Sequence, residues 1–146
     1  MRQKEGNALA EDILKKRKHI QYLVGLIKER SPLVVEQYQQ KMQSRLNELL
    51  ETVEIDQQRI VQEVAIFADR SCIDEEVIRL ESHLVQLQEI LSHGGQVGRK
   101  LDFLVQEMNR EANTIASKAN DMEITRNTIE LKSEIEKIRE QVQNIE

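Results

Sequence analysis

The stretch VGRKLDFLVQEMNREANTIASK, residues 97–118, decides the fold. Read as an α-helix at about 100° per residue, it divides into two faces. One face is apolar and comprises Val97, Leu101, Leu104, Val105, Met108, Ala112, Ile115 and Ala116. The other face is mostly polar and comprises Arg99, Asp102, Phe103, Gln106, Arg110, Asn113, Thr114 and Ser117, with Glu107 and Glu111 beside them. The segment predicts an amphipathic helix whose polar side either binds a ligand or packs on a neighbouring subunit.

Short motifs within and around this helix form a distinctive set. They are Gly98-Arg-Lys-Leu-Asp-Phe103, Gln106-Glu107, Asn109-Arg-Glu111, Asn113-Thr114, Ser117-Lys118, Asp74-Glu-Glu, Arg79-Leu-Glu-Ser-His83, Glu130-Leu-Lys and the final segment from Glu136 to Glu146. Together these residues resemble the signature of the bacterial YicC/YloC family. The resemblance implies a divalent-metal-dependent endoribonuclease that assembles as a hexamer. Family members also carry an amino-terminal half that contains strands, so this chain is expected to correspond to the carboxyl-terminal half.

The composition is typical of a helical bundle: 39% of the 146 residues are hydrophobic, only 3% are aromatic, and there is one proline. The net charge is −5, so an RNA site must be a local basic patch or depend on metal ions. Cys72 is the only cysteine, which excludes an intrachain disulfide. Because no apolar run approaches the ~20 residues of a membrane span and no signal peptide is visible, we expect a cytoplasmic protein with no membrane association.

Hydrophobic periodicity predicts an all-α fold of about six helices, forming antiparallel hairpins or a bundle with a long last helix. The expected helices cover residues 3–29, 31–50, 56–70, 71–92, 97–121 and 123–145. Ser31 fits an N-cap and Pro32 the first helical position, so we expect a boundary there and a hairpin within residues 1–51. Residues 56–146 are expected to form a helical core within a single region, 1–146.

Two of the expected helices have distinctive apolar patterns. Residues 60–68 are apolar nearly all round, which predicts a deeply buried helix preceded by Asp56 as its cap; a short buried strand is the alternative. The last helix carries an apolar seam at alternating steps of four and three residues: Ile124, Thr128, Leu131, Ile135, Ile138, Val142 and Ile145. This seam suits packing within the subunit or on a partner chain, and a homo-oligomer is expected.

Carboxylates are the best candidates for chemistry. Glu76 and His83 share a face of the helix over residues 74–92, and that face can meet the polar stripe of residues 97–118 if the two helices pack side by side. We expect catalytic roles for Glu107, Glu111 and His83. We expect metal ligation by Glu76, Asp102 and Glu107. Hard oxygen ligands of this kind suit Mg²⁺ or Mn²⁺, which engage substrate phosphate.

Arginine, lysine and amide side chains are the expected substrate-binding groups: Arg99, Lys100, Arg110 and Asn113. A guanidinium presents two parallel donors to phosphate oxygens. Phe103 can stack on a base, or it can belong to the core. With the resemblance, these groups predict metal-assisted hydrolysis of single-stranded RNA.

Structural alternatives stand beside these assignments. His83 can belong to a hydrogen-bond network with Glu76, and the acids can form ion pairs with Arg99 and Arg110. The basic run at residues 15–19 can guide RNA or be a solvated helix surface. At the level of function, the alternative is a non-catalytic helical scaffold for oligomerisation or for RNA or protein binding, and a purely structural coiled coil is a third reading.

Overall fold

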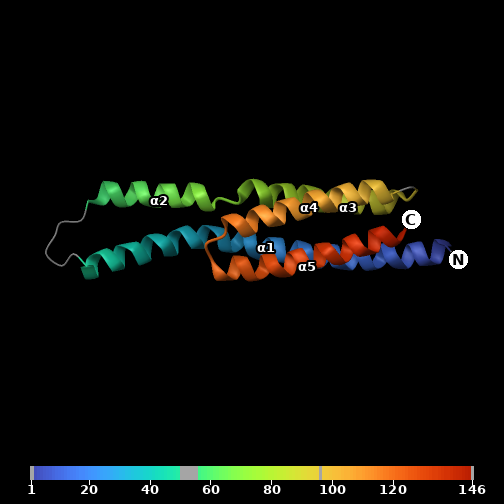
Figure 1. The fold of residues 1–146 in the computed structure, drawn as a ribbon, viewed down its shortest axis with the longest axis horizontal. Helices are drawn as coiled ribbons and strands as arrows, with labels where there is room; N and C mark the ends of the chain where they lie inside the picture. Colours follow the sequence, from blue (N-terminus) through green and yellow to red (C-terminus); the bar gives the residue numbers. More distant parts are fainter. Residues whose placement is uncertain (1, 50–55, 96, 146) are drawn as a thin grey trace.

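The computed structural model describes residues 2–49, 56–95 and 97–145. The described residues form five helices and no strand, which confirms the all-α fold with one helix fewer than expected (Figure 1). The helices are α1 (Arg2–Leu49), α2 (Gln57–Ser71), α3 (Asp74–His93), α4 (Gly98–Lys118) and α5 (Met122–Ile145).

The main correction concerns α1. The helices expected over residues 3–29 and 31–50 form one helix of 48 residues with Pro32 inside it, so the hairpin expected within residues 1–51 is wrong. An internal proline removes one backbone donor and usually costs ~3 kcal/mol. Contacts on both sides offset this cost: Arg30 donates to Gln37 on the same helix and to Asp121 ahead of α5, and Val34 is buried in the core. Position 51 lies outside the described residues.

Four helices enclose the core. The amino-terminal part of α1 packs on α3 and α5, and α4 packs on the same two helices, so the four close a ring (Figure 1). Fully buried side chains from all four helices fill the centre, among them Ile13, Ile20, Ile27, Leu80, Leu84, Leu87, Leu101, Met108, Ile115 and Leu131. The seam of α5 belongs to this core, because Ile124, Thr128, Leu131, Ile135, Ile138 and Val142 are each at most 3% exposed within the single chain.

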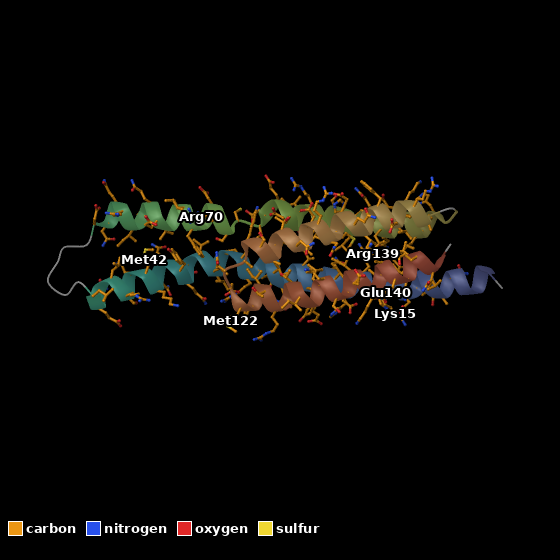
Figure 2. The ribbon with its side chains drawn as sticks, viewed as in Figure 1. Lys15, Met42, Arg70, Met122, Arg139 and Glu140 are labelled. Carbon is orange, nitrogen blue, oxygen red and sulfur yellow. The ribbon has the colours of Figure 1, made fainter. Side chains whose placement is uncertain are left out.

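Beyond this bundle, α2 runs beside the carboxyl-terminal part of α1 (Figure 1). Asp56 caps α2 as expected, accepting from the backbone N–H groups of Gln58 and Arg59. The deep burial expected for residues 60–68 is wrong, as is the alternative strand: in α2 only Ile60 is buried, and Val61 is 63% exposed. Side chains project from α2 on both sides of the ribbon in Figure 2.

The turn between α3 and α4 fixes how the polar faces meet. Gly94 and Gly95 have φ values of 67° and 85°, a conformation that glycine adopts without steric cost. The turn follows α3, which ends at His93, one residue past the expected end, and it lets α4 return antiparallel beside α3 (Figure 1). Among the described helices, none is both long and apolar enough to cross a bilayer.

Candidate metal centre

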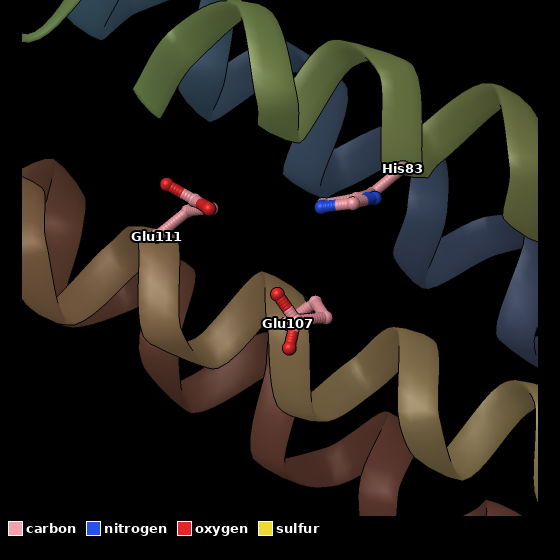
Figure 3. A group of neighbouring side chains, drawn as sticks. All are labelled: His83, Glu107 and Glu111. Atoms are coloured by element: carbon pink, nitrogen blue, oxygen red, sulfur yellow. The ribbon is translucent and has the colours of Figure 1, made fainter. Parts of the chain in front are cut away.

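Three predicted catalytic residues converge between α3 and α4. His83 projects from α3, and Glu107 and Glu111 project from α4 one turn apart (Figure 3). One nitrogen of His83 and one carboxylate oxygen from each glutamate lie within 4.8 Å of one another. We call these three residues the His–Glu cluster. The packing of α4 on α3, which the sequence alone gives only as a condition, therefore brings together His83, Glu107 and Glu111.

Burial makes the cluster more than a surface coincidence. Glu111 is only 5% exposed, and His83 and Glu107 are half-buried. The Nδ1 atom of His83 is buried and has no hydrogen-bond partner among the described residues. Buried polar atoms normally have a hydrogen-bond partner, so the lack of one at this nitrogen indicates that a water or another ligand binds beside His83. One imidazole and two carboxylates form a donor set that fits a divalent transition-metal ion.

Two arginines flank the cluster. Arg79 on α3 has Nη1 3.7 Å from Oε2 of Glu111, and Arg110 on α4 has Nη1 3.7 Å from Oε1 of Glu107. These separations are too long for hydrogen bonds, so they are loose ion pairs. The side chains of Arg79 and Arg110 are 54% and 74% exposed, which leaves both guanidinium groups accessible to an anion from solvent.

Glu76 lies apart from the cluster. Its buried carboxylate accepts a hydrogen bond from Nζ of Lys118 at 2.7 Å, and this contact raises the pKa of Lys118. Glu76 precedes His83 by seven residues, which is about 10 Å along a helix. The structure thus pairs Glu76 with Lys118 rather than with His83, and the expected network between His83 and Glu76 is replaced by a separate ion pair.

The remaining predicted residues lie on the outer surface of α4. Asp102 accepts a hydrogen bond from Nε2 of Gln106 at 3.1 Å and is not in the cluster. The expected substrate-binding side chains are all exposed: Arg99, Lys100, Arg110 and Asn113. Of these, Arg110 is the one that reaches a cluster carboxylate.

The sequence leads us to expect catalytic roles for His83 and Glu111, but it assigns no metal-ligand role to His83 and no substrate role to Arg79. The signal was present in the spacing. Glu107 and Glu111 are one turn apart on α4, and Arg79 and His83 are one turn apart on α3. What the spacing lacked was the register of one helix against the other.

The basic run at residues 15–19 is largely engaged within the chain. Lys16 pairs with Asp12 at 2.8 Å, Nε of Arg17 donates to the carbonyl oxygen of Leu84, and His19 contacts Glu130. The cations that flank the cluster are instead Arg79 and Arg110.

The fold and the cluster define a helical-bundle domain with a candidate divalent-metal centre. Residues 27–146 match the family described as "Endoribonuclease YicC-like, C-terminal". The chain is 50% identical over 147 residues to a "Probable endoribonuclease YicC" of Clostridioides difficile (strain 630), and 38% identical over 146 residues to a protein of the same name from Haemophilus influenzae (strain ATCC 51907 / DSM 11121 / KW20 / Rd).

Both alignments cover 100% of this chain and 50% of the relative. This chain belongs to the YicC-like endoribonuclease family and matches its carboxyl-terminal domain. It spans about half the length of the curated relatives it matches.

Proposed function

We propose that this chain supplies the metal-binding part of an endoribonuclease site that hydrolyses single-stranded RNA. The observation that carries the proposal is the convergence of His83, Glu107 and Glu111, with donor atoms within 4.8 Å of one another. The membership in a family of named endoribonucleases supplies the substrate class. The reaction is attack of water on a phosphodiester, which breaks one P–O bond and leaves a phosphate monoester and a hydroxyl.

The donor set favours Mn²⁺ over Mg²⁺. Mg²⁺ prefers oxygen ligands in a near-ideal octahedron, whereas one of the three donors here is an imidazole nitrogen. His83, Glu107 and Glu111 would hold the ion, each through one of the three donor atoms that converge. When bound, a divalent ion supplies Lewis acidity for the attacking water and offsets charge on the phosphodiester.

Arg79 and Arg110 position the phosphodiester. Each is an exposed arginine whose guanidinium is 3.7 Å from a cluster carboxylate. Arg110 is exposed and Glu107 half-buried, and exposed ion pairs contribute about 0–1 kcal/mol, so moving the Arg110 guanidinium onto a phosphate costs little. Glu111 is buried, and Arg79 also donates to Glu75 at 3.3 Å, so Arg79 would contact a phosphate while it stays beside Glu111. A bidentate contact with phosphate oxygens is shorter and stronger than these loose pairs. The two arginines approach the cluster from different helices and would hold the RNA backbone across it.

Metal binding by the cluster is tested on the chain itself. Mn²⁺ at about 100 times its Kd should stabilise the fold by about 2.7 kcal/mol, seen as a rise in Tm. Glu107→Gln and Glu111→Gln should each abolish most of the rise, and Glu89→Gln, an exposed glutamate elsewhere on α3, should leave it unchanged. A rise in Tm that persists in both cluster variants contradicts the metal centre.

Cleavage is tested with labelled single-stranded RNA in Mn²⁺ and in EDTA. Chelator-sensitive cutting should fall by at least about 100-fold in Glu107→Gln, since mutating even an outer-shell partner of a metal ligand typically costs about 10–100-fold, and Glu107 is proposed as a ligand itself. Mn²⁺ binding without RNA cleavage would indicate a metal-binding scaffold and would contradict the proposal that the domain belongs to an endoribonuclease site.

We also propose that this domain holds copies of the protein together. Met122, which Figure 2 labels at the start of α5, is 79% exposed, and Ile129, two turns later, is 65% exposed. The core seam of α5 is already covered within the chain, so a partner would have to use this outer face. Light scattering should give an oligomer, with six copies as the expected number, and Met122→Glu with Ile129→Lys should dissociate it; a monomeric wild-type chain would contradict this.

A further inference from the structure

A line of exposed side chains runs the length of α4. Its members are Arg99, Phe103, Gln106, Arg110, Asn113 and Ser117, and all six are exposed. Alternating steps of four and three residues keep them within about 40° of one line on the helix. The line extends over about 27 Å, at 1.5 Å per residue. We call these six residues the α4 stripe.

The chemistry of the α4 stripe differs from that of the whole chain. The chain has a net charge of −5, yet the stripe holds two arginines and no carboxylate. Its other polar members are two amides and a hydroxyl, which donate and accept hydrogen bonds with defined geometry. Gln106, Arg110, Asn113 and Ser117 also line a shallow hollow of about 390 Å³. A polyanion with hydrogen-bonding groups is complementary to this surface.

Phe103 adds an apolar surface to the stripe. Its side chain is 65% exposed, so the alternative that places Phe103 in the core is wrong. It lies one turn from Arg99 and two turns from Arg110. An exposed aromatic between cations is the arrangement with which proteins stack single-stranded bases while binding the backbone on either side.

The α4 stripe borders the His–Glu cluster. Arg110 belongs to the stripe and lies 3.7 Å from Glu107 of the cluster. Glu107 and Glu111 are turned from the stripe toward α3 by about 80–120° around the helix. A strand lying on the stripe therefore passes beside the cluster.

We propose that the α4 stripe is the track for a single-stranded segment of RNA, with one base stacked on Phe103 and backbone phosphates on Arg99 and Arg110. The amides of Gln106 and Asn113 bond base edges or 2′-hydroxyl groups. This inference rests on the proposed function for its ligand. It adds which surface of the domain the RNA occupies and which side chain it stacks on.

The test uses Phe103→Trp. The chain has no tryptophan, so the new indole is the only one, and it sits at an exposed position where folding is not at risk. Oligouridine is added in EDTA, so that no metal-dependent cleavage occurs. The emission should be quenched, with the same half-saturation as the anisotropy of a labelled oligouridine. Val61→Trp, at an α2 position of 63% exposure that lies outside the stripe, should not be quenched.

A second variant separates stacking from apolar contact. Phe103→Leu keeps an apolar side chain but has no π-face, so it should weaken RNA binding by about 5- to 150-fold. Phe103→Trp keeps the π-face and should retain the wild-type affinity for RNA. Unquenched emission at saturating RNA, wild-type affinity in Phe103→Leu, or no RNA binding at all would overturn the proposal. A blue shift that grows with protein concentration before RNA is added would assign the stripe to a contact between copies.

The metal site at the His–Glu cluster and the RNA track on the α4 stripe can be disproved independently of each other. The Mn²⁺-dependent rise in Tm reports on Glu107 and Glu111 and needs no RNA. Binding in EDTA reports on the α4 stripe and needs no metal. A cluster that binds Mn²⁺ beside an unquenched Trp at position 103 would leave the proposed function standing and remove only the track.

Discussion

Arg30 on α1 and Asp121 ahead of α5 form a two-point ion pair. Nη2 of Arg30 donates to Oδ1 of Asp121 at 2.9 Å, and Nε donates to Oδ2 at 3.0 Å. Their side chains are 17% and 12% exposed. Asp121 also caps α5 by accepting from the backbone N–H of Ile124. The pair fixes the last helix to the middle of the longest one, two residues before Pro32.

The first prediction concerns the pH dependence of this pair. The Arg30 guanidinium holds the pKa of Asp121 below its usual value of about 3.9. A depressed pKa gives stability that is complete above the unfolded value and is lost as the pH falls through the folded value. The difference in free energy of unfolding between the wild type and Asp121→Asn should therefore be largest at neutral pH and shrink below about pH 4. Urea unfolding followed by circular dichroism at both pH values measures it.

Asparagine is the matched control for the cap. Asn and Asp cap helices about equally well, so Asp121→Asn removes the charge and keeps the hydrogen bond to Ile124. Asp121→Ala removes both and should cost about 1 kcal/mol more than Asp121→Asn. If the difference in free energy of unfolding between the wild type and Asp121→Asn does not change with pH, the charge of Asp121 contributes nothing to stability.

The second prediction is that Pro32→Ala stabilises the protein. Pro32 lies inside α1 with an exposed side chain, so its replacement restores a backbone donor without opening a cavity. We expect a gain of about 2 kcal/mol, which is the helix penalty of proline less the entropy that proline removes from the unfolded chain. Urea unfolding measures the gain, and Ser31→Ala controls for helix propensity alone. Unchanged or lower stability would mean that Pro32 contributes contacts that outweigh its missing donor.

The continuation of α1 through Pro32 is a feature that the local sequence pattern could not predict. Period and composition sufficed for α3, α4 and α5, because each has a continuous apolar stripe and a glycine or aspartate near its end. Ser31 and Pro32 carry the local signals of a helix start. The structure overrides them through Arg30, whose partner Asp121 is distant in sequence. Local propensity yields here to a tertiary contact that no local pattern contains.

The burial of α2 failed for a different reason. Its apolar residues predict a buried helix only if other elements surround it, and the bundle is complete without it. The candidate site could be predicted only in part, because the sequence shows the faces of single helices but not how two helices pack. The faces of α3 and α4 could be drawn from spacing, which selected His83, Glu107 and Glu111. Their register against each other could not, and Glu76 therefore pairs with Lys118 outside the cluster.

The third prediction concerns that buried pair. Lys118→Met should lower the free energy of unfolding by about 2 kcal/mol, because it leaves the carboxylate of Glu76 buried without its donor. Adding Glu76→Gln should recover part of the loss, and the double-mutant cycle measures the coupling. Since Glu76 raises the pKa of Lys118, the contribution is complete below about pH 10 and is lost as the pH rises through the folded value.

Lys100→Met is the matched control, since Lys100 is exposed on the same helix and should change stability by less than about 0.5 kcal/mol. Additive effects of Lys118→Met and Glu76→Gln would show that the two residues do not interact in solution.

The last prediction is that α2 opens independently of the bundle. The rings of Tyr38 on α1 and Phe67 on α2 are stacked, with centroids 3.8 Å apart and planes at 4°, and α2 packs chiefly on α1. Phe67→Leu keeps an apolar side chain and loses the ring pairing, which is worth about 0.5–1.5 kcal/mol. Amide hydrogen exchange in α2 should therefore accelerate by about 2- to 12-fold while exchange in α4 is unchanged. Tyr38→Leu should reproduce the effect, and Val61→Ala, at an exposed position of α2, should not. If Phe67→Leu accelerates exchange equally in α2 and α4, the two unfold as one unit, and the stacked pair stabilises the whole domain.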